Sequence, residues 1–252
     1  MKPTRTVLYV GPSLLTGEPI LAVASSASSN RKTGDVVSTW ILRADVDPLR
    51  AIRSGADRAI CGDCRHRGTV DPTTGKHGYK RSCYVLPSQA PLAIYRALRR
   101  KANGHRIKPA DGETIATLGT GRVVRLGSYG DPAAVPIEVW QALLSRSLGH
   151  VGYTHQWRHQ VAAPLRRYCM ASVDTDAERE EAASLGWRTF RVLPYGAPVP
   201  DATNAHEIRC PADRPLPEPM SCDRCRLCDG ASRLSRPSIL IGAHGTPGAN
   251  IR

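Results

Sequence analysis

Cysteine spacing is the strongest constraint on how this chain can fold. Three of the eight cysteines form a C-x2-C-x18-C pattern, the N-terminal thiol set: Cys61, Cys64 and Cys83. Four others form a C-x11-C-x2-C-x2-C pattern, the C-terminal thiol set: Cys210, Cys222, Cys225 and Cys228. Thiolates at such short spacing are typical ligands of zinc or of an iron–sulfur cluster. We therefore expect two metal sites, each fixing the loops that carry its ligands.

The C-terminal thiol set favours a cluster over zinc. Structural zinc sites usually combine two separate C-x2-C pairs, whereas the run from Cys222 to Cys228 has three cysteines in one short stretch. A remote cysteine followed by proline, as at Cys210, is also a ferredoxin-like feature. Four thiolates would complete such a site, so we expect a [4Fe–4S] cluster here, with zinc as the alternative metal.

The N-terminal thiol set leaves two interpretations open. His66 and His77 lie in the same loop, so one of them can complete a structural Cys3His zinc site. The other interpretation is a cluster with three protein ligands and one open iron, where a small molecule binds. An open coordination position is the general sign of a metal used for chemistry. The spacing alone does not decide between them.

The pattern of apolar runs predicts an α/β fold. Residues 1–60 contain β-branched runs separated by Gly and Pro, which indicate a β-rich opening. Later segments alternate between strand-like and helix-like runs, which predicts βαβ units and a parallel sheet. The strands are too few for a full eight-stranded barrel, so we expect a partial (β/α)6 TIM-like barrel or an open doubly wound sheet. We assign residues 1–209, with the cysteine loop 61–84, to this unit, and residues 210–252 to a Cys-rich metal-binding extension.

Hydropathy predicts a cytoplasmic protein with no membrane partner. No apolar run approaches the roughly 20 residues that a membrane helix needs. The basic start of the chain is followed by an apolar stretch that Gly11, Pro12 and Gly17 interrupt, which argues against a secretion signal. Because structural disulfides are rare in the cytosol, free thiols in these patterns point to metal binding.

The charge balance makes nucleic acid a candidate partner. The chain has 35 Lys and Arg against 22 Asp and Glu, a formal net charge of +13. Such an excess favours contact with polyanions, chiefly nucleic acid. The arginines are scattered along the sequence, so an Arg-rich genome explains the same composition. Both interpretations stay open at this point.

The order of motifs resembles that of the radical S-adenosylmethionine enzymes. The cysteine loop ends in Cys83-Tyr84, an amphipathic helix follows, and the next predicted strand ends in the sequence GSYGDP. The chain is also similar to small phage-encoded iron–sulfur proteins, which implies a phage or bacterial origin. In the family, a three-cysteine loop after the first barrel strand holds a [4Fe–4S] cluster, and its open iron binds S-adenosylmethionine. The family's usual loop is C-x3-C-x2-C, from which the spacing here departs.

The resemblance implies roles for particular residues. Cys61, Cys64 and Cys83 would hold the reactive cluster, and the C-terminal thiol set would hold an auxiliary one. Tyr84 would lie beside the cosubstrate. Gly130 and Asp131 take the place of the family's GGEP-like motif, which contacts the methionyl amino group.

Three polar residues are expected at strand ends. Asp131 is a candidate catalytic and cosubstrate-binding residue, or alternatively a helix N-cap. His155, in the polar and aromatic run YTHQWRH, is a candidate catalytic residue, and Ser172 is a candidate cofactor-binding residue. The features together predict an iron–sulfur enzyme acting on nucleic acid or a nucleotide. The alternative is a non-catalytic zinc or iron–sulfur protein that binds nucleic acid.

Overall fold

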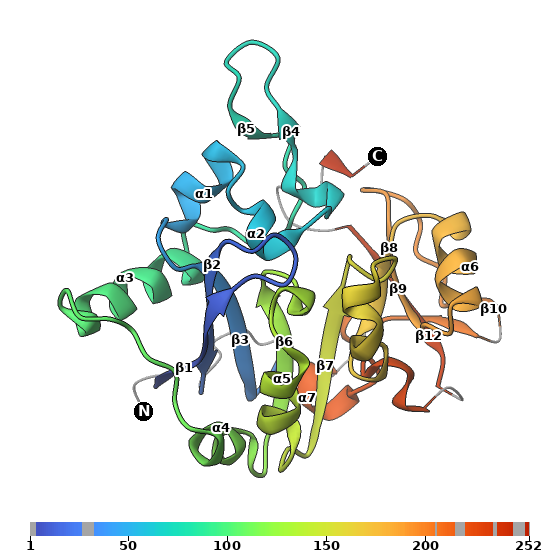
Figure 1. The fold of residues 1–252 in the computed structure, drawn as a ribbon. Helices are drawn as coiled ribbons and strands as arrows, with labels where there is room; N and C mark the ends of the chain where they lie inside the picture. Colours follow the sequence, from blue (N-terminus) through green and yellow to red (C-terminus); the bar gives the residue numbers. More distant parts are fainter. Residues whose placement is uncertain are drawn as a thin grey trace.

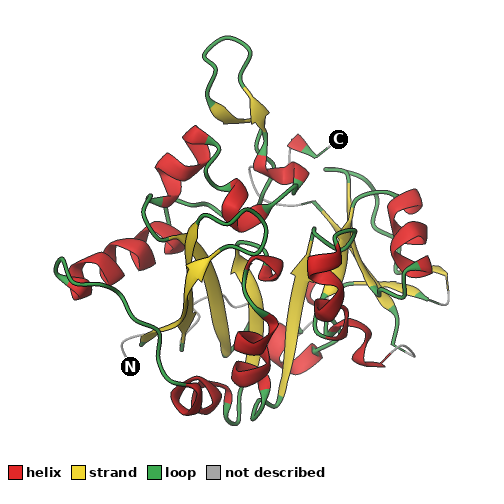
Figure 2. Ribbon diagram, viewed as in Figure 1, coloured by secondary structure: helices red, strands yellow, loops and turns green. Residues whose placement is uncertain are grey.

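The sheet runs through most of the molecule. The computed structural model describes residues 4–26, 33–204, 206–214, 220–233, 236–243 and 250–251. Within these residues one ten-stranded sheet has the order β1-β2-β3-β6-β7-β8-β9-β12-β11-β10 (Figure 1; Figure 2). Its strands are β1 (Arg5–Pro12), β2 (Pro19–Ser25), β3 (Val36–Arg43), β6 (Val123–Tyr129), β7 (Gly149–Thr154), β8 (Met170–Val173), β9 (Thr189–Leu193), β10 (Ala202–Asn204), β11 (Glu207–Arg209) and β12 (Ser238–Gly242). A separate small hairpin pairs β4 (Thr69–Val70) with β5 (His77–Tyr79).

Helices flank this sheet. The α-helices are α1 (Pro48–Ser54), α2 (Arg58–Cys61), α3 (Ala90–Ala102), α4 (Gly112–Gly119), α5 (Ile137–Leu144), α6 (Asp176–Ser184) and α7 (Cys222–Cys225). Short 3-10 helices are η1 (Arg65–Arg67), η2 (Pro132–Ala134), η3 (Gln160–Arg167), η4 (Pro211–Asp213) and η5 (Gly230–Arg233). Among the helices described, none combines the length and the apolar character needed to cross a membrane.

The strand order confirms the expected α/β class. Strands β1, β2 and β3 pair antiparallel, and every neighbouring pair from β3 to β11 is parallel. From β3 to β9, each parallel strand is added on the same side of the one before it in the chain. A doubly wound sheet reverses its order near its centre, and these strands show no reversal. In the described part of the chain the sheet is open, with β1 and β10 as its edges.

The end of β6 is fixed by the helix that follows it. Trp140 on α5 is fully buried and its indole Nε1 donates to the carbonyl oxygen of Pro132 at 3.0 Å. Gly130 makes the turn before η2 with a φ of +80°, and a Cβ there would lie 2.7 Å from Cβ of Ile41. The glycine is thus required both by the left-handed backbone and by close packing.

The C-terminal segment belongs to the same sheet. Strand β12 lies between β9 and β11 and pairs in parallel with both. Residues 210–252, which the sequence assigns to an extension, therefore contribute a central strand, and position 209/210 does not separate two sheets.

A buried ion pair spans this part of the sheet. Arg191 on β9 donates from Nε and Nη2 to the two carboxylate oxygens of Glu207 on β11, at 3.1 and 2.5 Å. The two side chains are 7% and 1% exposed, and they reach over the intervening β12. Asp176 on α6 accepts a further bond from Arg191 at 2.8 Å, so the guanidinium joins three elements.

We predict that Arg191→Met lowers the free energy of unfolding by about 3–5 kcal/mol, because the variant leaves Glu207 charged and buried without its guanidinium. Urea denaturation followed by circular dichroism measures this loss. Arg146→Met is the control, since Arg146 pairs with Glu113 at the exposed surface. Equal stability of the two variants would contradict the structural role of the buried pair.

Candidate metal centre

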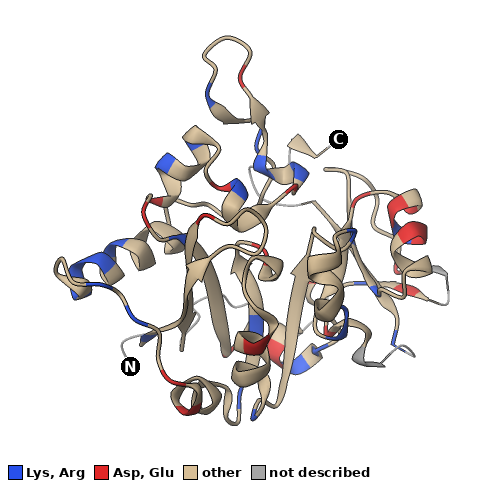
Figure 3. Cartoon of the chain, viewed as in Figure 1, with Lys and Arg blue, Asp and Glu red and all other residues tan. Residues whose placement is uncertain are grey.

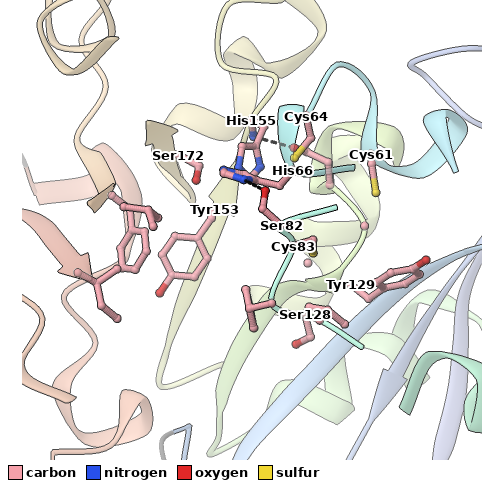
Figure 4. Close-up of a pocket in the computed structure, with 18 of the residues that line it drawn as sticks. Cys61, Cys64, His66, Ser82, Cys83, Ser128, Tyr129, Tyr153, His155 and Ser172 are labelled. Carbon is pink, nitrogen blue, oxygen red and sulfur yellow. Dashed lines mark hydrogen bonds between the residues drawn. The ribbon is translucent and has the colours of Figure 1, made fainter. Parts of the chain in front are cut away.

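Both thiol sets border one cavity. Its volume is about 280 Å³, and its walls include all three cysteines of the N-terminal thiol set together with Cys210 and Cys222. Cys61, Cys64 and Cys83 lie on one side, and Tyr153 and Ser172 lie across from Cys61 (Figure 4). The cavity thus connects two groups of cysteines that are far apart in the sequence.

The N-terminal thiol set lies at the carboxyl ends of the parallel strands. The carbonyl oxygen of Cys61 accepts a hydrogen bond at 3.0 Å from Nε2 of Gln156, which follows β7. The backbone N–H of Asp131, which follows β6, donates to the carbonyl oxygen of Ile60 at 2.6 Å. In parallel α/β proteins this edge of the sheet is where ligands bind.

A hairpin accounts for the long gap between Cys64 and Cys83. Strands β4 and β5 form a narrow extension that projects away from the sheet (Figure 1). At its base the carbonyl oxygen of His66 accepts hydrogen bonds from the N–H groups of Ser82 and Cys83, at 3.2 and 3.0 Å. The chain therefore leaves and returns at one point, and the C-x2-C-x18-C spacing still places three thiols along one cavity.

Neither histidine of this loop offers an unoccupied ring nitrogen to the cavity. Nδ1 of His66 is hydrogen-bonded to Oγ of Ser82 at 2.7 Å, and Nε2 to Oδ1 of Asp174 at 3.2 Å. His77 is exposed on β5, and it does not line the cavity. Both ring nitrogens of His66 are thus occupied, which disfavours the Cys3His interpretation of the N-terminal thiol set.

Burial keeps the thiols of the N-terminal set protonated in the absence of a cation. Burial raises the pKa of Cys64 to about 12. Burial, followed by the charges of Asp57, Cys64 and Cys83, raises the pKa of Cys61 well above its usual value. Deprotonation therefore requires a strong positive charge at this place, and a metal supplies one. Within the described residues, no three His, Cys, Asp or Glu side chains stand close enough together to hold a metal ion.

The C-terminal thiol set lies near the amino ends of the strands. The N–H of Asp223 on α7 donates to the carbonyl oxygen of Thr33, which precedes β3, at 3.2 Å. Arg226 donates to the carbonyl oxygen of Leu148, just before β7, at 3.1 Å. Burial, followed by the charges of Cys222 and Cys225, raises the pKa of Cys210 to about 11.

Arg188 holds the loop that carries Cys228. Its Nη1 donates to Oδ1 of Asp229 and to the carbonyl oxygen of Gly230, both at 2.7 Å. Its Nη2 donates to the carbonyl oxygens of Leu227 and Pro237, at 2.8 and 2.5 Å. Because Arg188 is 4% exposed, this clamp connects the Cys228 loop to the core of the sheet.

Asp131 is bound on all sides by protein donors. Its carboxylate accepts from Oγ1 of Thr154 and the N–H of His155, both at 2.7 Å, and from the N–H of Ala133 at 3.0 Å. The last bond makes Asp131 the N-cap of η2, as the alternative interpretation expected. The residue is 5% exposed and burial raises its pKa. It borders the cavity, and its catalytic role stays a prediction.

The other predicted site residues also border the cavity: Tyr84, Gly130, His155 and Ser172. The ring of His155 lies edge-on to that of His66, with centroids 5.4 Å apart. Burial lowers the pKa of His155, so its imidazole is neutral at pH 7 and has a nitrogen that can accept a proton. Tyr84 is 51% exposed and lies at the solvent side of the cavity.

Three further residues line the cavity without having been predicted from the sequence: Arg125, Tyr153 and Phe190. Arg125 projects from β6, and Tyr153 on β7 packs against Phe190 on β9, with ring centroids 4.4 Å apart. A signal was present for Arg125, since it is a lone charge within the otherwise uncharged strand Val123–Tyr129. A charged side chain in a buried strand often marks a functional site.

No family model, no curated protein and no solved structure compared with the chain matches it. The resemblance to radical S-adenosylmethionine enzymes therefore stays a prediction. Function is inferred below from the cavity and the residues that border it.

We predict that the tip of the hairpin is dispensable for metal binding. Replacing residues 71–76 by a two-residue Asn-Gly turn should leave the bound metal per chain unchanged, because β4 and β5 can still pair and the base of the hairpin is intact. Metal analysis of purified protein measures this. Gly68→Ala is the matched change at the base: its Cβ would lie 2.5 Å from the carbonyl oxygen of Tyr79 at a φ of +85°, so metal content should fall. If the variant with the shortened hairpin loses metal, the tip of the hairpin is needed for metal binding and the prediction is wrong.

Proposed function

We propose that the protein is an iron–sulfur enzyme of the radical S-adenosylmethionine type, in which the N-terminal thiol set holds the reactive [4Fe–4S] cluster. The observation that carries the proposal is the single cavity bordered by both thiol sets. Three cysteines line it at the carboxyl ends of the strands, where α/β enzymes place their chemistry.

The number of ligands assigns different roles to the two sets. Four cysteines complete the coordination of a cluster, so the C-terminal set is structural or relays electrons. Three cysteines leave one iron open, and His66 is held by Ser82 and Asp174 instead of serving as a fourth ligand. In a cubane each thiolate binds a different iron, so its ligands lie further apart than those of a single zinc ion.

The chain has residues suited to holding S-adenosylmethionine. Tyr84 and Gly130 border the cavity near the N-terminal thiol set, and Ser172 lies across the cavity from Cys61. When bound, the cluster and this cosubstrate supply one-electron chemistry that side chains alone cannot perform. Tyr153 and Phe190 form a wall that excludes water, and the neutral imidazole of His155 can accept a proton from the substrate.

The sheet is consistent with this enzyme type. In the proposal, β3, β6, β7, β8, β9 and β12 are the six strands of an incomplete (β/α)6 barrel, and the order of β3 to β9 along the sheet follows the chain. The cysteines do not form disulfides with one another, which also favours the reducing cytoplasm.

We predict that anaerobically purified protein contains about eight irons and as much sulfide, as expected for two [4Fe–4S] clusters. Cys61→Ser should lose about half of that iron while keeping the fold, because it removes one ligand of one cluster. Cys169→Ser is the matched control, since Cys169 is fully buried in the core and does not line the cavity. Iron and sulfide assays with visible absorbance measure the effect. Two zinc ions and no iron would overturn the proposal.

A second candidate function, nucleic-acid binding, is favoured by one surface segment. Residues 90–110 contain no Asp or Glu, and this stretch forms α3 and the loop after it. Its exposed cations are Arg96, Arg99, Arg100, Lys101, Arg106 and Lys108, which we call the α3 basic segment. Figure 3 shows basic residues in blue on α3 and on the loop after it, whereas acidic residues, in red, gather on α6. Six of the 35 Lys and Arg residues thus form a local basic surface, as phosphate binding requires.

We predict that single-stranded DNA binds this surface with an affinity that falls steeply as salt rises. Substituting Gln for Arg96, Arg100 and Lys101 together should lower the slope of log K against log salt by about 0.7 per cation lost. Gln at Arg146, Arg158 and Arg179 is the matched control, since these cations are paired with carboxylates elsewhere. Fluorescence anisotropy measures both slopes. If the affinity for DNA does not depend on salt, or if the α3 variant has the same slope as the unmodified protein, the α3 basic segment does not bind nucleic acid. The net charge of the chain then reflects amino-acid composition alone.

A further inference from the structure

Arg125 lies in the cavity between the two thiol sets. It projects from the middle of β6, and its Nη2 donates to the hydroxyl of Tyr84 at 2.5 Å. The guanidinium carbon is 5.9 Å from the ring centroid of Tyr153. Its Nε is buried and makes no hydrogen bond. The side chain therefore has donors to spare inside a largely apolar space.

Arg125 differs from the other arginines in the interior. Arg67 pairs with Asp57 at 2.6 Å, Arg188 with Asp229 at 2.7 Å and Arg191 with Glu207 at 2.5 Å. In the described part of the chain, no carboxylate forms an ion pair with Arg125. Arg125 is half-buried. A guanidinium that is partly removed from water without a counter-charge is unfavourable, so an anion supplied from elsewhere would stabilise it.

The ionisable groups that act most strongly on Arg125 do not include a carboxylate. They are two tyrosines, Tyr84 and Tyr153, and two thiols of the C-terminal thiol set, Cys222 and Cys228. Within the protein, a metal-bound thiolate of the C-terminal thiol set would be a source of negative charge for Arg125. The variants of Arg125 distinguish this counter-charge role from the binding of a ligand.

We propose that Arg125 binds the anionic group, a carboxylate or a phosphate, of a small ligand with a flat apolar body. A guanidinium fork matches either group with two parallel hydrogen bonds. The paired rings of Tyr153 and Phe190 form an apolar wall beside it. The cavity of about 280 Å³ is near the lower end of the range for small-molecule sites, which limits the ligand to a compact molecule.

This site deepens the proposed function, because it names the substrate class of the same cavity. It does not depend on that function for its test. Anion binding is measured directly, without turnover, so a protein that binds zinc in place of iron can still bind the anion.

The experiment uses the full chain, purified anaerobically, and three probes with the same ring: phenylacetate, phenyl phosphate and phenylacetamide. Isothermal titration calorimetry gives their dissociation constants. At least one of the two anions should bind more tightly than the neutral amide, and which anion binds tells carboxylate from phosphate. Arg125→Gln should weaken that binding on the order of 10- to 100-fold, as expected for losing charged hydrogen bonds.

Three further variants test whether the guanidinium itself binds the anion. Arg125→Lys retains the charge without the fork and should give an intermediate affinity. Tyr84→Phe removes the hydroxyl that orients the guanidinium, so it should weaken binding by a smaller factor even if Arg125→Gln folds poorly. Arg146→Gln, a change in an exposed ion pair, should have no effect.

Three results would overturn the proposal. They are the absence of binding by both anions, equal binding of the amide, or an Arg125→Gln variant with unchanged affinity. If that variant loses iron while keeping its affinity for the anion, Arg125 is the counter-charge of the C-terminal thiol set and not a ligand-binding residue.

Discussion

The buried carboxylate of Asp131 is the interaction on which the site depends. It joins the turn after β6 to the end of β7 through Thr154 and His155, while its own N–H holds the backbone beside Cys61. Three donors offset the cost of burying the carboxylate, and each comes from the protein. The position of the cysteine loop over the strand ends is therefore set by hydrogen bonds within the fold, before any metal or ligand binds.

Hydrogen bonds within the fold also hold the loops that carry the two thiol sets, which lie at opposite ends of the strands. His66 closes the hairpin base near Cys83 through its carbonyl oxygen, and Arg188 clamps the loop around Cys228. Neither residue is a ligand in the proposed iron–sulfur enzyme, yet each fixes the backbone that carries ligands. The cavity between the sets consequently depends on the sheet as well as on the loops, since its walls include residues of strands β6, β7 and β9.

The sequence allowed prediction of the features that depend on local pattern. The α/β class and the parallel strands follow from periodicity and residue type. What remained hidden depends on contacts between distant residues. Spacing could not show that a hairpin closes the gap before Cys83, that β12 enters the sheet between β9 and β11, or that Arg125 lacks a carboxylate partner. Asp131 is an example: the sequence predicted its position at a strand end, but not the three groups that donate hydrogen bonds to its carboxylate.

The place of β12 has a consequence for biosynthesis. A ribosome releases the chain from its N-terminus, so β9 and β11 emerge before the strand that lies between them. Until residues 238–242 arrive, both neighbours present unpaired backbone edges, and such edges are templates for association with other chains. The nascent protein therefore passes through a stage in which its sheet lacks the strand between β9 and β11. Chaperones that cover exposed strands would act at this gap.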